Sequence, residues 1–348
     1  MLSEMKACRG LYFRCLLAML VAFSEVRSQE SNGELQDPAR RVLFELGENR
    51  PISLKRMTAE QRNEVVRVQI LLDEAGFAPG KIDGVPGEFM DKAGTRYLAA
   101  QVGGMGLGLA DLRLPAERGT YTAHRVSGKD VAMVGEVPTV PEAQSRTKSL
   151  PYGSVLEFLT ERYHCSPILL EALNPTLNLE RLRVGDLVVV PAVQPFLIED
   201  VPPQGNYPEI PEHAGRSVRV SVKERVLEVR EAERLIASFP VTTGSAATPT
   251  PVGKWKILGR SSRPVFRWDE GVLNHGVRTE SFFMLPPGPN NPVGVVWVAL
   301  NRSGIGIHGT NNPQTIGRSG SHGCIRLANW DAVRFVAMVT EGVPVTIE

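Results

Sequence analysis

The sequence predicts an α+β multidomain protein: a mainly β C-terminal domain, sandwich- or barrel-like, preceded by small helical and βααβ modules. The chain has 348 residues, about two to three times the length of a typical domain. After residue 216, short runs such as 218–222 alternate apolar with polar residues between Pro- and Gly-rich turns, as half-buried strands do. Upstream, within residues 65–75 and again within 156–163, apolar residues recur at spacings of three and four, the period of helices.

Composition excludes several protein classes. Charged residues make up 22% of the chain and apolar residues 42%, which are ordinary values for a globular protein. Lys and Arg together number 39 against 38 Asp and Glu, so no basic excess points to nucleic acid as a partner. No stretch reaches about 18 consecutive apolar residues, so we expect no integral membrane span.

Residues 1–28 have the pattern of a secretory signal peptide. Basic residues such as Lys6 and Arg14 precede a short apolar segment, 16–23, and small residues allow cleavage after Ser28. We therefore expect export to the periplasm or cell envelope. An ordinary buried N-terminal helix is the alternative.

A polar linker is expected over residues 29–53, and a helical module over residues 54–101. Within the module, one helix runs from Thr58 to a stop at Gly76, and a second spans 91–100. The glycine-rich loop between them and the apolar run before it resemble the small peptidoglycan-binding module. A helical packing unit without a ligand is the alternative.

Residues 102–145 are rich in Gly and Pro and predict an irregular connector. Over residues 146–193, two helices with Ser caps precede a buried strand at 187–190. This order, with Leu-Asn-Pro after the second helix, resembles a lysin motif, a module that binds the N-acetylglucosamine chains of cell walls. A degenerate copy kept for packing is the alternative. Five prolines predict an extended linker over 194–215.

The last domain, residues 216–348, begins with three short strands. Further along, a strand-like segment spans 293–307, and a late helix over 330–340 is expected to be capped by Asn329. The strand-like segment ends at Ile-His-Gly-Thr, which includes His308. A polar loop then leads to a Ser-His-Gly-Cys sequence, and we expect this loop to fold back.

His308 and Cys324 carry the chemistry if they meet. A free thiol has a pKa of about 8.5, and an imidazole that accepts its proton leaves a thiolate–imidazolium pair, a strong nucleophile. The imidazole then needs an acceptor for its other nitrogen, and since the motif holds no carboxylate we expect a backbone carbonyl. Gly323 allows close approach of a substrate, and N–H groups around Gly323 and Cys324 can hold an oxyanion.

Other readings of the same residues are open. Two histidines and a cysteine could bind zinc, but no carboxylate base and no His-Glu-x-x-His sequence accompanies them. Cys324 could be a buried structural residue, or it could pair with Cys165 in a disulfide. His308 could be an inert residue at the end of a strand. We expect no metal and no cofactor.

The C-terminal domain resembles the L,D-transpeptidase family of cell-wall enzymes. The resemblance rests on Thr-Pro-Thr-Pro-Val-Gly at 248–253, the Pro- and Asn-rich run at 286–292, His-Gly at 308–309 and Ser-His-Gly-Cys-Ile-Arg-Leu at 321–327. It implies Cys324 as nucleophile and His308 as base. It also implies that the carbonyl of Gly309 orients His308, that His322, Gly323 and Cys324 form the oxyanion region, and that Ser321 and Arg326 bind the substrate.

The resemblance also implies a reaction and its partners. The donor is a peptidoglycan stem tetrapeptide, which loses its terminal D-Ala to give a thioester on the enzyme. An amine of a second stem then forms a 3→3 cross-link, water gives carboxypeptidase activity, and a Lys of an outer-membrane lipoprotein is a third acceptor. A thiolate nucleophile of this kind is sensitive to carbapenems. A non-catalytic protein that binds wall glycan through its N-terminal modules is the alternative.

Overall fold

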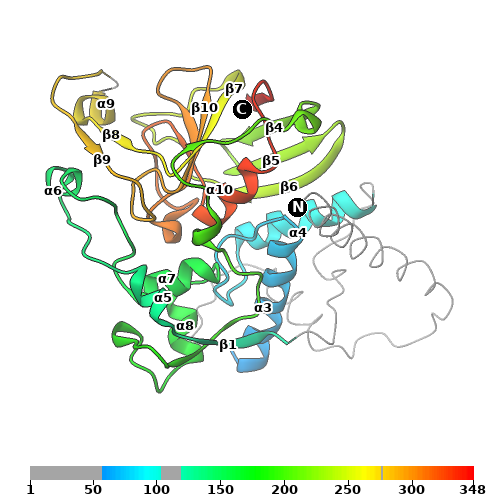
Figure 1. Cartoon of the computed structure of the whole chain (residues 1–348). Coiled ribbons are helices and arrows are strands. Elements are labelled where there is room, and N and C mark those ends of the chain that lie inside the picture. Colours follow the sequence, from blue (N-terminus) through cyan, green and yellow to red (C-terminus); the bar gives the residue numbers. More distant parts are fainter. Residues whose placement is uncertain (1–56, 103–118, 276) are drawn as a thin grey trace, which may run out of the picture. The chain divides into compact units, whose positions relative to one another are not determined.

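The computed structural model describes residues 57–102, 119–275 and 277–348, which all belong to one compact unit, residues 42–348 (Figure 1). The signal peptide expected over 1–28 and the linker expected over 29–53 lie outside the described residues. No helix in the described ranges combines the length and the apolar character needed to cross a membrane.

Two helices form the first module. Thr58 caps α3 (Ala59–Glu74) in a capping box, since its Oγ1 accepts from Gln61 N at 3.2 Å while Gln61 Oε1 accepts from Thr58 N at 2.9 Å. Gly76 follows the helix with φ +83°, the left-handed conformation that ends many helices. The second helix, α4 (Glu88–Val102), begins earlier than expected. The two helices share a small core of Val65, Val68, Leu72, Phe77, Met90 and Ala93.

The second module is larger than the sequence predicted. Its strands β1 (Tyr121–Arg125) and β2 (Leu187–Pro191) pair in antiparallel fashion. Ser154 and Ser166 cap the two predicted helices. The helices between the strands are α5 (Gly128–Ala132), α6 (Pro141–Ser145), α7 (Val155–Arg162), α8 (Pro167–Leu173) and the 3₁₀ turn η3 (Leu179–Arg181). The expectation of irregular structure over 102–145 is wrong for its described part, because β1, α5 and α6 lie there.

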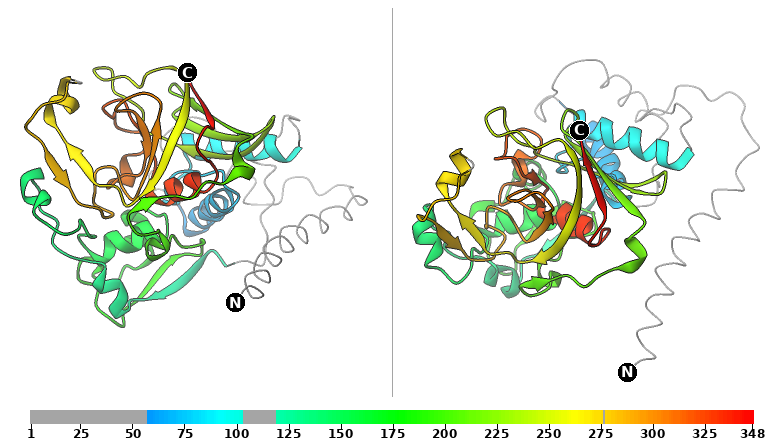
Figure 2. Two further views of the ribbon diagram at one scale, coloured as in Figure 1. Left: turned by 45° about the horizontal axis from the view of Figure 1, so that its top comes forward. Right: turned by 90° about the horizontal axis from the view of Figure 1, so that it is seen from above.

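A single curled sheet forms the C-terminal domain (Figures 1 and 2). Its strand order is β12-β11-β10-β7-β13-β4-β5-β6, with β3 beside β7. The pairs β11–β12 and β13–β4 are parallel, and the others are antiparallel. The strands are β3 (Gly205–Asn206), β4 (Arg216–Ser221), β5 (Val226–Glu231), β6 (Arg234–Pro240), β7 (Gly253–Ser262), β10 (Val296–Leu300), β11 (Gly306–His308), β12 (Ile325–Arg326) and β13 (Pro344–Ile347). The predicted mainly β class is confirmed.

The segment 194–215 is not a free linker. It contains η4 (Ile198–Asp200), β3 and η5 (Pro211–His213), and β3 pairs with β7. Arg263 fixes its first part, because Nη2 donates to the carbonyls of Ile198 at 2.9 Å and Val201 at 3.1 Å. Buried apolar side chains such as Phe196 and Val201 therefore pack with the core, which the proline content did not indicate.

Two further elements complete the domain. A small hairpin of β8 (Phe266–Trp268) and β9 (Phe283–Leu285) carries α9 (Glu270–His275) between its strands. The late helix α10 (Asn329–Val336) packs against β10 and β11 and is shorter than the predicted 330–340. Asn329 is the first residue of α10 and not its cap; the cap position belongs to Ala328 and has no side-chain hydrogen bond.

A buried ion network joins the helical modules to the sheet domain. Asp73 Oδ2 lies 3.0 Å from His164 Nδ1 and 2.8 Å from Arg334 Nη2, and His164 stacks on Trp330 with ring centroids 5.1 Å apart. Burial alone raises the pKa of Asp73, but His164 and Arg334 hold the pKa of that carboxyl below its usual range. One hydrophobic core also continues from the modules into the sheet.

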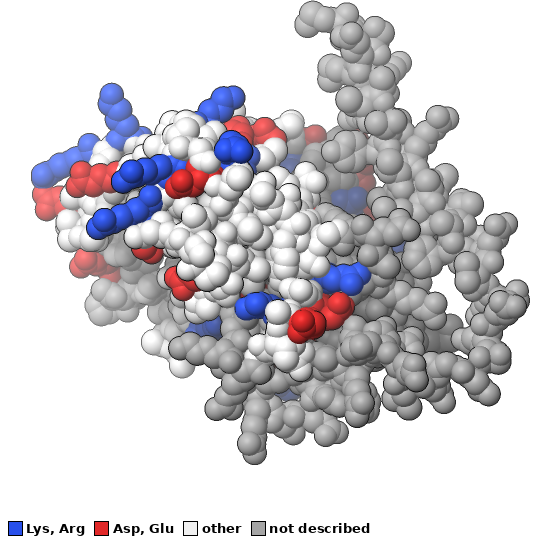
Figure 3. Space-filling model, turned by 90° about the horizontal axis from the view of Figure 1, so that it is seen from below, with Lys and Arg blue, Asp and Glu red and all other residues white. Residues whose placement is uncertain are grey.

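Charges of both signs are mixed on the face shown in Figure 3, where Lys and Arg lie close to Asp and Glu around a largely uncharged area. This distribution matches the near balance of 39 basic and 38 acidic residues in the chain. On that face, neither sign forms a continuous field of the kind that attracts a charged polymer.

Candidate active site

Two neighbouring strands bring the predicted histidine and cysteine to one edge of the sheet. β11 ends at His308, and its parallel partner β12 begins at Ile325, immediately after Cys324. The register sets His308 opposite Arg326. Cys324 directly precedes β12, so it lies at the same edge of the sheet as His308 and Arg326.

The segment 293–307 is a hairpin and not one strand. β10 and β11 run antiparallel, with Trp297 opposite His308. The indole of Trp297 stacks on the imidazole, with ring centroids 5.3 Å apart and planes inclined by 17°. A Cβ on Gly306 would lie 2.5 Å from this indole, so glycine is needed there for the ring to approach the strand.

His308 is buried, with 3% of its surface exposed, and its tautomer is fixed. Its Nδ1 lies 2.6 Å from the carbonyl oxygen of Gly309. A carbonyl oxygen can only accept, so Nδ1 carries the proton of the neutral ring. Burial lowers the pKa of His308 to about 3, and the nearby positive charge of Arg326 acts in the same direction, while backbone hydrogen bonds with Gly309 and Val293 oppose them.

Cys324 is a free thiol with partial exposure. Its Sγ donates to the carbonyl of Gly304 at 3.4 Å, and no hydrogen bond in the described structure joins it to His308. Burial raises the pKa of the Cys324 thiol, and a backbone hydrogen bond with Gly306 and the positive charge of Arg326 partly offset this effect. Burial therefore favours the neutral form of both Cys324 and His308, which is the opposite of the thiolate–imidazolium pair expected from the sequence.

Ser321 organises the turn that presents Cys324. It is buried, accepts from Gly323 N at 3.2 Å and donates to the carbonyl of Cys324 at 2.5 Å. Gly323 has φ +101°, a conformation that favours glycine. The loop before β7 holds the turn from outside, since Ser321 N donates to the carbonyl of Thr243 at 2.8 Å. Ser321, predicted to bind substrate, thus uses its hydroxyl within the turn.

The backbone donors of this turn differ in availability. The N–H of Gly323 is engaged by Ser321. Those of His322 and Cys324 have no hydrogen-bond partner among the described residues. Two of the three predicted oxyanion positions therefore offer unengaged donors beside the sulfur.

Arg326 supplies an uncommitted positive charge. Its Nε is buried and has no hydrogen-bond partner within the described part of the chain. Burial lowers the pKa of this guanidinium, and the neighbouring Cys324 opposes that shift. His322 is exposed, and partial burial and Arg326 lower the pKa of its imidazole. An anionic group of a ligand can therefore pair with Arg326 without displacing a protein partner.

The alternative roles of the cysteines receive no support from the described geometry. Cys165 is fully buried, burial raises the pKa of its thiol, and neither Cys165 nor Cys324 is in a disulfide. Within residues 57–102, 119–275 and 277–348, no group of three or more His, Cys, Asp or Glu is arranged to hold a metal ion.

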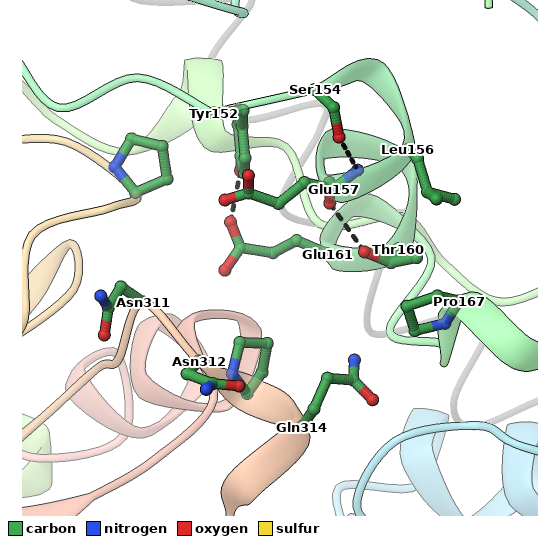
Figure 4. Close-up of a pocket in the computed structure, with 12 residues that line it drawn as sticks. Tyr152, Ser154, Leu156, Glu157, Thr160, Glu161, Pro167, Asn311, Asn312 and Gln314 are labelled. Carbon is green, nitrogen blue, oxygen red and sulfur yellow. Dashed lines mark hydrogen bonds between the residues drawn. The ribbon is translucent and has the colours of Figure 1, made fainter. Parts of the chain in front are cut away.

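A separate cavity of about 210 Å³ lies between α7 and the loop that follows His308 (Figure 4). Its walls include Tyr152, Glu157 and Glu161 on one side and Asn312 and Gln314 on the other. None of the site residues predicted from the sequence lines it. Its two carboxylates are engaged by neighbours: Glu157 Oε1 accepts from Asn290 Nδ2 at 2.7 Å, and Tyr152 hydrogen-bonds Glu161.

Two side chains at the site were not predicted. Trp297 was hidden because its β10 position shows only as one apolar residue in an alternating strand. Asn329 was recognised, but as a helix cap, whereas its side chain instead contacts Val295, just before β10, and the loop after β11. Both contacts join segments that are distant in sequence, and local pattern does not reveal them.

Comparison with known proteins gives a family match for the C-terminal domain and relatives of the chain. Residues 215–347 match the family YkuD, described as the L,D-transpeptidase catalytic domain. A protein named L,D-transpeptidase YkuD from Bacillus licheniformis is 28% identical over 195 residues, which cover 56% of this chain and 94% of that protein. Its namesake from Bacillus subtilis is 27% identical over 202 residues, covering 58% of this chain and 98% of the relative.

Among solved structures, an L,D-transpeptidase from Mycobacterium smegmatis is similar with a TM-score of 0.32 and 20% identity. The overlap covers 38% of this chain and 58% of that one. The match to the Bacillus licheniformis protein, at 195 residues, is longer than the family match and therefore includes residues outside 215–347.

Proposed function

Because residues 215–347 are an L,D-transpeptidase catalytic domain, and the chain therefore a peptidoglycan L,D-transpeptidase, we propose that Cys324 is its nucleophile and attacks stem tetrapeptides. The observation that carries the proposal is the position of Cys324 directly before β12, which is the parallel neighbour of β11 and His308, together with the contact of His308 Nδ1 with the carbonyl of Gly309. Nucleophile, base and orienting acceptor are the three parts that acyl transfer needs.

In the proposed reaction, the sulfur attacks the carbonyl that joins the third stem residue, usually diaminopimelate, to terminal D-Ala. The thiol proton passes to Nε2 of His308 as the C–S bond forms. The same proton then passes to the departing amine, and D-Ala leaves with a thioester remaining on Cys324. An amine or water attacks the thioester, gives its proton to His308 and releases the thiol.

Two features of the turn support binding and stabilisation of that substrate. The unengaged N–H groups of His322 and Cys324 are placed to receive the oxyanion of the tetrahedral intermediate, and each such donor typically contributes about 10²–10³-fold to a rate. Arg326, whose Nε has no partner in the described structure, pairs with a carboxylate of the stem.

The surroundings of the reaction are part of the proposal. The signal-like residues 1–28 support export to the periplasm or cell envelope. The two N-terminal modules support binding to wall glycan, and the acceptor is a second stem, water or a Lys of an outer-membrane lipoprotein.

The test is release of D-Ala from a defined tetrapeptide muropeptide by the full chain. Cys324→Ala is expected to abolish release while the protein stays folded, and one carbapenem molecule is expected to add to Cys324 in the unmodified protein. Cys165→Ala is the matched control, since Cys165 is buried away from the site and should keep both properties. Release of D-Ala by Cys324→Ala at the rate of the unmodified protein would remove the proposed mechanism.

A further inference from the structure

The side chain of Asn329 is hydrogen-bonded to the backbone next to Gly309, whose carbonyl accepts from Nδ1 of His308. Its Oδ1 accepts from the backbone N–H of Val295 and of Thr310, both at 3.2 Å. The side chain is fully buried, with 0% of its surface exposed. A Cβ added at Gly309 would lie 2.1 Å from this Oδ1, and one added at Gly294 would lie 2.0 Å from it. The two glycines therefore leave the space that the amide fills.

Glu161 of α7 sets the orientation of that amide. Glu161 Oε1 accepts from Asn329 Nδ2 at 2.7 Å. The other carboxylate oxygen is held by the hydroxyl of Tyr152, as Figure 4 shows. Because only the nitrogen of an amide can donate to a carboxylate, this contact turns Oδ1 towards the two backbone N–H groups. A reversed amide would leave two buried N–H groups facing an NH₂ group.

The chain of contacts ends at the proposed base. Asn329 holds the N–H of Thr310, which belongs to the same peptide unit as the carbonyl of Gly309. That carbonyl in turn holds Nδ1 of His308 at 2.6 Å. Fixing one side of a planar peptide fixes the other, so the direction in which Gly309 accepts from His308 depends on Asn329.

We propose that Asn329 is a positioning residue for His308, and that Glu161 makes the lysin-motif-like module a working part of the active site. Through the hydrogen bond between Glu161 and Asn329, the module affects the tautomer and the orientation of the His308 imidazole, independently of any binding to glycan. This inference rests on the proposed function of His308 as the base.

The test reverses the polarity of the Asn329–Glu161 hydrogen bond in the full chain at pH 8. Asn329→Asp keeps an oxygen for Val295 and Thr310 but sets a second carboxylate against Glu161. Glu161→Gln alone keeps an acceptor for Asn329 and is the matched control. In the double variant, the introduced amide at position 161 can donate to the introduced carboxylate at position 329 and still accept from Tyr152.

The expected results are specific to positioning. Asn329→Asp lowers kcat for D-Ala release about 10²-fold, the scale of a misplaced catalytic group, with a much smaller change in KM. Glu161→Gln lowers kcat less than Asn329→Asp does, because the Asn329 amide keeps an acceptor at position 161, and the double variant recovers to within about tenfold of the unmodified protein, as coupled partners do. In ¹⁵N NMR of the imidazole, Asn329→Asp gives a mixture of tautomers, and the double variant returns to the Nδ1–H form.

Three outcomes overturn the proposal: an unchanged kcat in Asn329→Asp, an unchanged tautomer in that variant, or no recovery in the double variant. The tautomer measurement needs no substrate. If the unmodified chain releases no D-Ala, the proposed function fails, while the NMR comparison still decides whether Asn329 and Glu161 position His308.

Discussion

The charge state of Cys324 before substrate binds gives the most direct prediction. The perturbation is pH, and the quantity is the rate at which iodoacetamide alkylates Cys324 in the full chain. Only the thiolate reacts, and an ordinary thiol with a pKa of about 8.5 is a few per cent ionised at pH 7. Burial raises the pKa of Cys324 further, so we expect the rate to rise about tenfold per pH unit, or about 100-fold between pH 6 and pH 8.

A resting thiolate–imidazolium pair would give a different dependence of the alkylation rate on pH. A thiolate–imidazolium pair would hold the thiolate form from about pH 5 upward, and the rate would stay nearly constant across the same range. The assay is mass spectrometry of the peptide that contains Cys324, sampled during the first few per cent of reaction. A plateau that begins near pH 6 would refute the argument that burial keeps both groups neutral. The buried Cys165 in the same digest gives the internal control and should react far more slowly.

The other predictions concern stability and charge. Arg334→Met is expected to lower the free energy of unfolding by about 3–5 kcal/mol, because it removes one ion-pair partner of the buried carboxylate of Asp73. Denaturant titration measures this change. The control, Arg234→Met at an exposed ion pair, should change the free energy of unfolding by less than about 1 kcal/mol. Arg326→Met should slow alkylation of Cys324 by anionic iodoacetate more than by neutral iodoacetamide, and equal slowing would contradict a free positive charge at position 326. Burial raises the pKa of Glu161 to about 7, so the folded protein loses stability as the pH rises from 4.5 through 7. Glu161→Gln should therefore be more stable than the unmodified protein at pH 8. Thermal melts of the two proteins should show that this difference vanishes near pH 4.5.

Local signals in the sequence were enough for several elements. The helix start at Thr58, the Ser166-Pro start of α8 and the stop at Gly76 depend only on neighbouring residues, and the structure has each of them. Strand alternation after residue 216 likewise predicted a mainly β domain. Strand β1 was not predicted, because its pairing partner β2 begins more than 60 residues later and no local pattern marks it.

The errors at the site have the same origin. Asn329 stands just before an apolar helical run, where asparagine usually caps, but its amide contacts Val295, just before β10, and Glu161 of α7 instead. The residue types His308 and Cys324 indicated a nucleophile and a base, but their protonation depends on burial, which is a tertiary property. Sequence could therefore identify the reacting groups and could not give their resting charge.

A neutral resting pair changes what activates the enzyme. Burial raises the pKa of Cys324 and lowers that of His308 to about 3, so both shifts oppose transfer of the thiol proton to the imidazole. In the proposed mechanism, attraction between the ions and the oxyanion donors of His322 and Cys324 offset this cost, and the donors do so only when a carbonyl occupies the turn. The sulfur then reacts mainly with a bound acyl group. Proton transfer also depends on where Nε2 of His308 points, so the proposal gives the contacts of Asn329 behind the imidazole a part in the rate.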